Sequence, residues 1–428
     1  MNFGLGTYGM DHGNSSQWPQ GVPQFYDISD RDALCFFMNK RQFETIKGFP
    51  IITVLPLVSR TMDADQACFG AGFSQLLMRN LMLLPNVSVL GPRDTPRVHF
   101  EDSEMVVGDH DRRIVITGKV RTNGKQCRAK FYIHSTLFES ESITAGGDTP
   151  EEFYIDSMKV LTEKLGGKYN DRIEQQLQIG QPRRIESLFH LGKLLLEVQP
   201  KDMKKAAPNF LNLYQYDPSF TVPLWNYVAP ATDQTRQTFL TAIKRDPSNA
   251  LMYWIMFNQL WKIDSQADPV AFQFCRKAVE ISPGLARAHL CMSHAAPVDR
   301  RMLAHAILSY TLIPRSTEAI CNYISVLRNT NGPIDLQYTL GEEGMRIDSK
   351  NPILFDHMID ISCKQNHFKV AMEFAQKALA LFSPAPNPHA MTCLKQNPER
   401  GKALSLGKFK PVDYYQATIR NLKKKIKR

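Results

Sequence analysis

Six prolines divide the second half of the chain at nearly regular intervals, and this spacing constrains the fold more than any other feature. They lie 29 to 38 residues apart, at positions 218, 247, 283, 314, 352 and 384. Around them an apolar helical pattern ends in a small-residue turn and a second pattern follows, as in RKAVEISPGLARAHL, residues 276–290. A period near 34 is typical of helix-turn-helix repeats. Because proline lacks an N–H and fixes φ, it ends one helix and suits the first turn of the next.

Alanine recurs at a fixed place in these repeats. Ala242, Ala278 and Ala378 lie five or six residues before their prolines. A small side chain there lets neighbouring helices approach closely, and an amphipathic helix pair can bury its apolar face only by stacking on the next pair. We therefore expect residues 187–392 to form a helical solenoid with a concave groove. The alternative is a set of ordinary helices whose prolines happen to be spaced in this way.

The first half of the chain has the pattern of a small α/β domain. FPIITVLPLV and NVSVLGP are typical of strands, and ACFGAGFSQLLMRNLMLL between them is typical of a helix. RRIVITGKV and CRAKFYIHSTLF flank Asn123-Gly124, which suits a hairpin, and a further helix follows a cap at Thr149 or Asp148. This order predicts an α+β chain in which residues 34–166 form a mixed sheet covered by two helices, with polar residues on the surface.

The remaining segments complete the expected organisation. Residues 1–33 are rich in Gly, Ser, Gln and Pro and indicate a flexible arm, 167–186 a polar linker, and 393–428 a basic tail. The chain start lacks a signal-peptide pattern, and no segment approaches the roughly 18 unbroken apolar residues of a membrane helix. Eight scattered cysteines without a C-x-x-C pair favour free thiols in a reducing compartment. We therefore expect a cytoplasmic protein.

The positive charge is concentrated at the C-terminus. The formal net charge is +10, and residues 395–428 alone contain eleven basic and two acidic side chains. Tyr415, Ile419, Leu422 and Ile426 are spaced as one apolar stripe of a helix whose other face is basic. Three interpretations are open: a helix that covers the last repeat, binding to an acidic protein or anionic membrane surface, and binding to RNA or DNA.

The sequence predicts no catalytic, cofactor-binding or metal-binding set. The motifs G-x-x-x-x-G-K-[ST], H-E-x-x-H and G-x-S-x-G are absent, and GLGTYG near the start lacks the flanking strand and helix of a dinucleotide site. Asp63 and Asp65 precede a helix, where capping is favoured over catalysis. One acidic and histidine-rich group could hold a metal in principle, but solvated loops favour such residues anyway. Its members are His99, Glu101, Asp102, Asp109, His110 and Asp111.

The second half of the chain resembles tetratricopeptide repeats, most closely in FQFCRKAVEISPGLARAHL and FKVAMEFAQKALALFSP. The first half is similar to the TolB-like amino-terminal domain that precedes such repeats in bacterial regulators and adenylate-cyclase-associated proteins. The matching segments are ITVLPLV, GFSQLL, LPNVSVLGP and RIVITGKVRTNGKQCRAKFYIHSTL. Together the two resemblances cover about residues 49–390 and imply an α/β TolB-like domain followed by an all-α solenoid.

Repeat architecture without a catalytic set predicts a non-enzymatic scaffold or adaptor that binds a protein or peptide in the groove of the repeats. The alternative is a sensory or regulatory module of a transcription or signalling system, whose basic tail contacts nucleic acid or an anionic surface. Most aromatic side chains of LMYWIMFNQLW are expected in the core, with one or two lining the groove. The candidate partner-binding residues are Tyr253, Trp254, Phe257, Arg287, His289, Lys423, Lys424, Lys425, Lys427 and Arg428.

Overall fold

The structure is a computed structural model of the chain. It describes residues 40–92, 94–95, 112–123, 125–135, 140–198, 202–227, 232–261, 269–295, 300–313, 315–397, 400, 403–404 and 406–427. The predicted flexible arm, Pro314, Arg428 and the histidine-rich group at 99–111 lie outside these residues. Within the described ranges, no helix combines the length and apolar character needed to cross a membrane.

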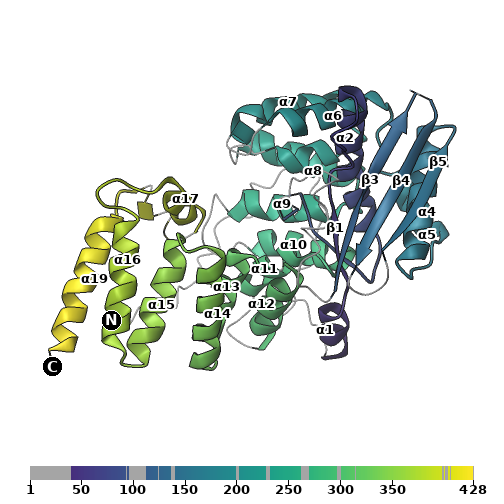
Figure 1. Cartoon of the computed structure of the whole chain (residues 1–428). Helices are drawn as coiled ribbons and strands as arrows, with labels where there is room; N and C mark the ends of the chain where they lie inside the picture. Colours follow the sequence, from purple (N-terminus) through teal and green to yellow (C-terminus); the bar gives the residue numbers. More distant parts are fainter. Residues whose placement is uncertain are drawn as a thin grey trace.

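A five-stranded mixed sheet lies at one end of the molecule (Figure 1). Its strands are β1 Ile51–Val54, β2 Ser88–Val89, β3 Arg113–Thr122, β4 Cys127–Ser135 and β5 Glu141–Gly147. The spatial order is β2-β1-β3-β4-β5, with β1 parallel to β2 and β3, and β4 antiparallel to β3 and β5. The predicted mixed sheet is confirmed, and β5 is an edge strand that the sequence did not predict.

Two helices, α2 Ala64–Leu81 and α4 Pro150–Lys164, pack on one face of the sheet. In β4, buried side chains alternate with more exposed ones, because only one face of that strand is covered. Both helices begin at the predicted caps. Asp63 accepts a hydrogen bond from the backbone N–H of Gln66, and Thr149 forms a capping box with Glu152. The capping role predicted for Asp63 is therefore confirmed.

The remaining elements are helical. They are α1 Lys40–Lys47, α5 Asp171–Gln178, α6 Glu186–Glu197, α7 Met203–Tyr216, the 3₁₀ helix η5 Val222–Asn226, α8 Asp233–Arg245, α9 Ala250–Trp261, α10 Pro269–Ile281, α11 Ala286–Ala295, α12 Arg300–Leu312, α13 Thr317–Asn329, α14 Ile334–Ile347, α15 Pro352–Lys364, α16 Phe368–Ala380, α17 Pro388–Gln396 and α19 Pro411–Ile426. The predicted breaks at prolines 218, 247, 283, 352 and 384 all lie between helices or at a helix start. Helix α5 lies within the segment predicted as a linker.

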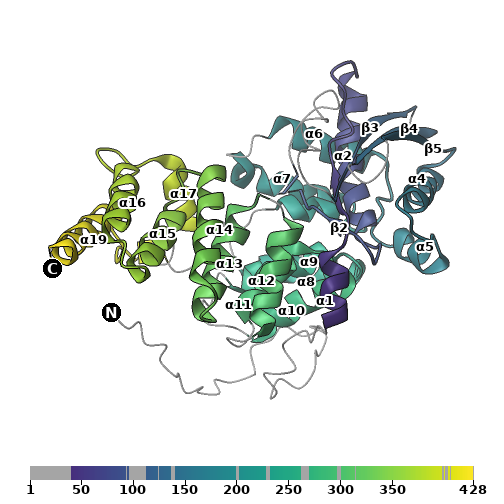
Figure 2. The ribbon, with the colours of Figure 1, turned by 60° about the horizontal axis from the view of Figure 1, so that its bottom comes forward.

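From α10 onward, each helix packs against the next one along the chain as far as α16, and α19 packs on α16. The helices α11, α13, α15 and α17 also contact one another in that order. Figures 1 and 2 show α13 to α16 and α19 as a row that extends away from the sheet. The three alanines predicted at close helix contacts, Ala242, Ala278 and Ala378, are fully buried.

One apolar core runs without interruption from the sheet into the helices as far as α11. It includes Ile52 of β1, Phe73 of α2 and Met292 of α11. Further clusters lie between α12 and α15, and between α15 and α19. The predicted boundary at 167–186 therefore does not separate two cores, because the sheet and the first helices bury the same apolar surface.

Candidate functional site

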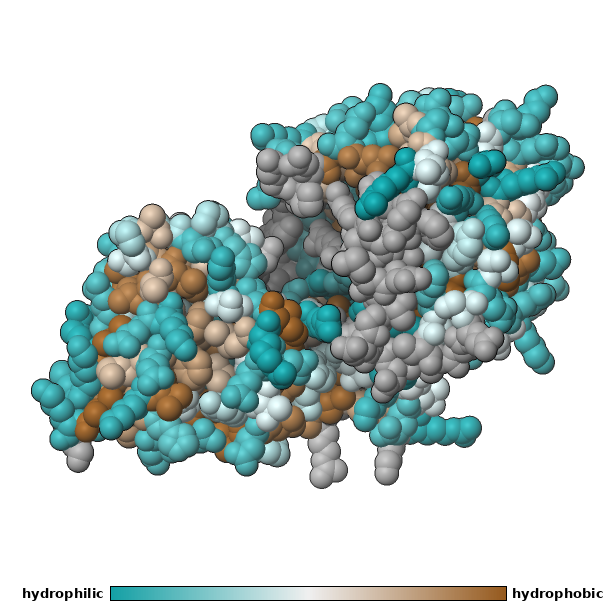
Figure 3. Space-filling model, in the orientation of Figure 1, coloured by the Kyte–Doolittle hydropathy of each residue, from teal (hydrophilic) through white to brown (hydrophobic). Residues whose placement is uncertain are grey.

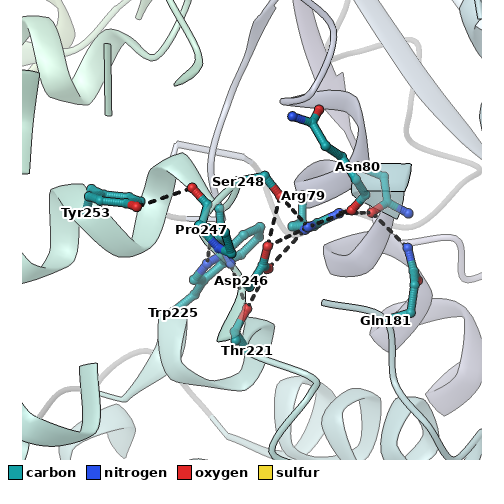
Figure 4. A network of polar contacts seen from close by, with 11 residues as sticks. Arg79, Asn80, Gln181, Thr221, Trp225, Asp246, Pro247, Ser248 and Tyr253 are labelled. Atoms are coloured by element: carbon teal, nitrogen blue, oxygen red, sulfur yellow. Dashed lines mark hydrogen bonds and ion pairs between the residues drawn. The ribbon is translucent and has the colours of Figure 1, made fainter. Parts of the chain in front are cut away.

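A buried ion pair joins the sheet-bearing part of the chain to the helices that follow it. Arg79 of α2 donates to both carboxylate oxygens of Asp246, at 2.5 and 3.1 Å, and the two side chains are 1% and 0% exposed (Figure 4). Arg79 also donates to the side chains of Asn80 and Ser248 and to the carbonyl of Gln176. This overturns the expectation that polar residues of the α/β domain lie on its surface.

The carboxylate of Asp246 also accepts hydrogen bonds from residues other than Arg79. Asp246 follows α8, directly before one of the repeat prolines, and accepts hydrogen bonds from Thr221 at 3.0 Å and Ser248 at 3.0 Å. Asn249 extends the network by donating to Thr221 and accepting from the indole N–H of Trp225 (Figure 4). A buried pair this fully hydrogen-bonded is typical of a structural joint.

Three aromatic residues of α9, of which one or two were expected to line a groove, lie in the core. Tyr253, Trp254 and Phe257 of α9 are each about 5% exposed or less. Tyr253 donates its hydroxyl to the carbonyl of Pro247, and the ring of Phe257 packs against Phe272 of α10. The expectation that most of these rings are core residues is confirmed. None of the three presents an appreciable surface to a partner in this structure.

Arg287, another predicted binding residue, contacts the chain's own acidic side chains. Its guanidinium donates to Asp94 at 2.5 Å and pairs with Glu318 of α13, and it lies 6.0 Å from the ring centroid of Trp254. Burial lowers the pKa of Arg287, but the charges of Asp94 and Glu318 outweigh burial and raise it overall. Arg287 therefore links the segment after β2 to α11 and α13.

His289 is fully buried and pairs with His305 of α12. Their Nδ1 atoms are 2.8 Å apart, and Nε2 of His289 lies 2.8 Å from the carbonyl oxygen of Pro283. Since that oxygen can only accept, Nε2 of a neutral His289 carries the proton, and its Nδ1 accepts from His305. Burial lowers the pKa of His289 to about 4, and burial together with His289 lowers that of His305 to about 3. The pair is a neutral structural contact.

The free energy of unfolding should fall as the pH decreases from about 6.5 to about 4, by up to about 1.4 kcal/mol per pH unit for each histidine of this pair. Both pKa values are lower in the folded chain than the unperturbed 6.5. In this window the unfolded chain therefore binds protons that the folded chain does not. The stability is present above pH 6.5 and is lost as the pH falls toward the folded pKa values. Urea titrations at stepped pH measure the slope.

The variant His305→Asn tests whether the buried histidine pair causes this loss of stability. The asparagine amide can still donate a hydrogen bond toward His289, but it does not titrate. This variant should reduce the dependence of stability on pH in this window. His367→Asn, at an exposed position before α16, is the matched control and should leave the dependence unchanged. If the free energy of unfolding changes equally with pH in the wild type, His305→Asn and His367→Asn, the buried pair does not cause the loss of stability in acid.

The described basic residues of α19 lie on its outer face. Tyr415 and Leu422 are buried against the preceding helices, and Lys423, Lys424 and Lys427 are exposed. Lys425 is also exposed, with its ammonium 5.1 Å from the ring centroid of Phe368. Helix α19 thus covers the end of the helical row, as one of the three interpretations predicts. The basic face remains open to solvent.

Among the described residues, one group of side chains could hold a metal ion: Asp348, His389 and Cys393. The sequence predicted no metal ligands here. His389 and Cys393 are one helical turn apart on α17, a spacing visible in the sequence, but Asp348 is 41 residues before His389. Burial, together with the charge of Asp348, raises the pKa of the Cys393 thiol to about 11.

Comparisons with known proteins give no independent identification. No model of a known protein family matches the chain, and no curated protein matches it in sequence.

Proposed function

We propose that the chain is a protein-interaction scaffold, in which tetratricopeptide-like repeats follow a TolB-like α/β domain and bind a protein or peptide. The observation that carries the proposal is the neighbouring arrangement of α13, α15 and α17, which contact one another in sequence order. The helices α14 and α16 alternate with them along the chain, as the second helix of each pair does in such repeats. Peptide recognition by stacked repeats uses the inner helices.

The first inner helices are covered by the chain's own α/β part. Ser88 of β2 donates to the carbonyl of Gly284, just before α11, at 2.7 Å, and Asp94 pairs with Arg287. Gly91 lies close to Leu251 of α9. A partner therefore has access to the later helices, and Figure 3 shows a hollow between the lobe that they form and the rest of the molecule.

The open face of the later helices carries charges of both signs. Arg328 of α13 lies 3.6 Å from Asp360 of α15, and both side chains are about 40% exposed. Lys364 of α15 also pairs with Asp360 at 3.6 Å. Exposed ion pairs of this kind contribute at most about 1 kcal/mol to stability, so they are free to exchange for contacts with a charged peptide.

The double variant Arg328→Ala/Asp360→Ala should weaken partner binding about tenfold, or about 1.4 kcal/mol, without unfolding the protein. Partners are recovered by affinity purification with full-length protein, identified by mass spectrometry, and titrated against each variant. Lys193→Ala/Glu197→Ala removes an exposed pair on α6 and is the control. A partner that binds the wild type and both variants equally would exclude this face.

A second arm of the same experiment tests the basic tail. Lys423, Lys424 and Lys427 are exposed, so their replacement by glutamate should preserve packing of α19, and Lys425 is kept because its ammonium lies over the ring of Phe368. If the tail binds nucleic acid or an anionic surface, this variant abolishes binding, and wild-type affinity falls steeply with salt. Loss of binding in the tail variant alone would favour the regulatory alternative over the groove.

A further inference from the structure

Three different ligand atoms converge where α14 ends and α17 begins. Asp348 follows the last residue of α14, and His389 and Cys393 lie on successive turns of α17. The Oδ2 atom of Asp348 is 2.8 Å from Nε2 of His389, and Sγ of Cys393 is 3.6 Å from the same Nε2. All three donor atoms lie within 4.8 Å of one another.

We propose that Asp348, His389 and Cys393 form a binding site for a divalent transition-metal ion, with Zn²⁺ as the best match. The mixed oxygen, nitrogen and sulfur donors suit Zn²⁺, whereas Mg²⁺ and Ca²⁺ prefer oxygen ligands alone. With a thiolate and a carboxylate as ligands, the charge of Zn²⁺ is balanced. This proposal is independent of the partner-binding face proposed above.

The donor spacing is close to that of a tetrahedral site. With Zn–S near 2.3 Å and Zn–N near 2.05 Å, a tetrahedral ion separates sulfur and nitrogen by about 3.6 Å. The Sγ to Nε2 distance in the structure is 3.6 Å. Oxygen and nitrogen ligands would lie about 3.4 Å apart, so Oδ2 must retreat by roughly 0.6 Å when an ion enters. A small rotation of the Asp348 side chain provides this movement.

The same distances do not fit a cysteine–histidine–aspartate nucleophile. In such a site the carboxylate holds one ring nitrogen of histidine, and the thiol faces the other. Here Asp348 and Cys393 both face Nε2 of His389. One proton on Nε2 can be directed at only one of them, whereas one metal ion contacts all three donor atoms.

The surrounding backbone holds the donors in place and leaves them accessible. Asn387 caps α17 by accepting from the N–H groups of His389 and Ala390, which fixes the first turn of that helix. The N–H of Lys350 donates to Oδ1 of Asp348 at 3.1 Å, so Oδ2 is the oxygen turned toward His389. The His389 side chain is 53% exposed, so an ion can reach the site and a water molecule can take a fourth position.

The test uses full-length protein, freed of metal with a chelator and titrated with Co²⁺, whose absorption reports thiolate ligation. We expect about one Co²⁺ per chain with a thiolate charge-transfer band, displacement of that band by Zn²⁺, and a higher Tm when Zn²⁺ is added. Cys393→Ser should abolish the band. Asp348→Asn and His389→Gln should each weaken binding at least tenfold.

The matched control is Cys363→Ser, which removes another partly exposed thiol, on α15, and should leave the band and the affinity unchanged. The ligand variants should unfold at nearly the temperature of the metal-free wild type, because the three side chains are partly exposed. A wild-type protein without a thiolate band, or a band that persists in Cys393→Ser, would overturn the proposal.

Discussion

Asp246→Ala should lower the free energy of unfolding by about 3–5 kcal/mol. The substitution leaves the guanidinium of Arg79 buried, with the side chain 1% exposed, and without its carboxylate partner. The remaining acceptors, Asn80, Ser248 and the carbonyl of Gln176, are neutral and cannot balance the charge. Denaturant titrations of full-length protein measure the loss. Hydrogen exchange should show increased opening of both α2 and α8, because the pair joins the ends of these helices.

Glu280→Ala is the matched control for removal of an acidic partner. Glu280 accepts from Arg276 at 3.0 Å, but both side chains are about one third exposed, so water replaces the lost contact. The expected loss is below about 1 kcal/mol. If the two alanine variants lose similar stability, the ion pair between Arg79 and Asp246 is hydrated in solution, and it does not join the two parts of the chain.

The double variant Arg79→Met/Asp246→Leu distinguishes two contributions to the free energy of unfolding: the destabilisation by an unpaired buried charge, and the stabilisation by the intact ion pair. Removing both charges avoids burying either one alone, so this protein should be more stable than Asp246→Ala. It should still be less stable than the wild type. Thr221, Ser248 and the carbonyl of Gln176 would lose hydrogen-bond partners, and unsatisfied buried polar groups are costly.

Features set by neighbouring residues could be predicted from the sequence. The cap at Thr149 and the helix breaks at Pro247 and Pro283 depend on local backbone chemistry, and all three are present. Strand β5 was missed because its apolar alternation is short, with only Ile143 and Ala145 set among polar residues and glycines. Helix α5 was missed because only Ile173 and Leu177 of its polar sequence are buried.

Features that depend on contacts between distant segments could not be predicted. Arg79 looks like a surface residue in sequence, and its partner is 167 residues away. His289 has the helical position of a groove residue, but α12 supplies His305 to cover it. The burial of the α9 aromatic residues also could not be predicted in detail. Their spacing in the sequence identifies an apolar helix face, but it does not reveal which segment packs on that face.

The helices α2 and α6 cross at glycine residues, and we expect substitution there to cause the second large loss of stability. Gly192→Ala should lower the free energy of unfolding by about 3 kcal/mol, although alanine favours an isolated helix by about 1 kcal/mol over glycine. A Cβ at Gly192 would lie 1.6 Å from the carbonyl oxygen of Cys68, and one at Gly72 would lie 2.0 Å from that of Leu188. Neither contact can be relieved by a side-chain rotation, because both involve backbone atoms. Thermal and denaturant unfolding of the full-length variant measure the loss.

Gly341→Ala separates the effect of the helix crossing from that of glycine replacement in general. Its Cβ would meet the sulfur of Met358 at 2.2 Å, and a flexible methionine can move away from it. The gain in helix propensity then offsets most of the cost, and we expect a change within about 1 kcal/mol. A Gly192→Ala protein as stable as the wild type would mean that α2 and α6 are farther apart in solution. The shared core would then not require the close approach of their backbones.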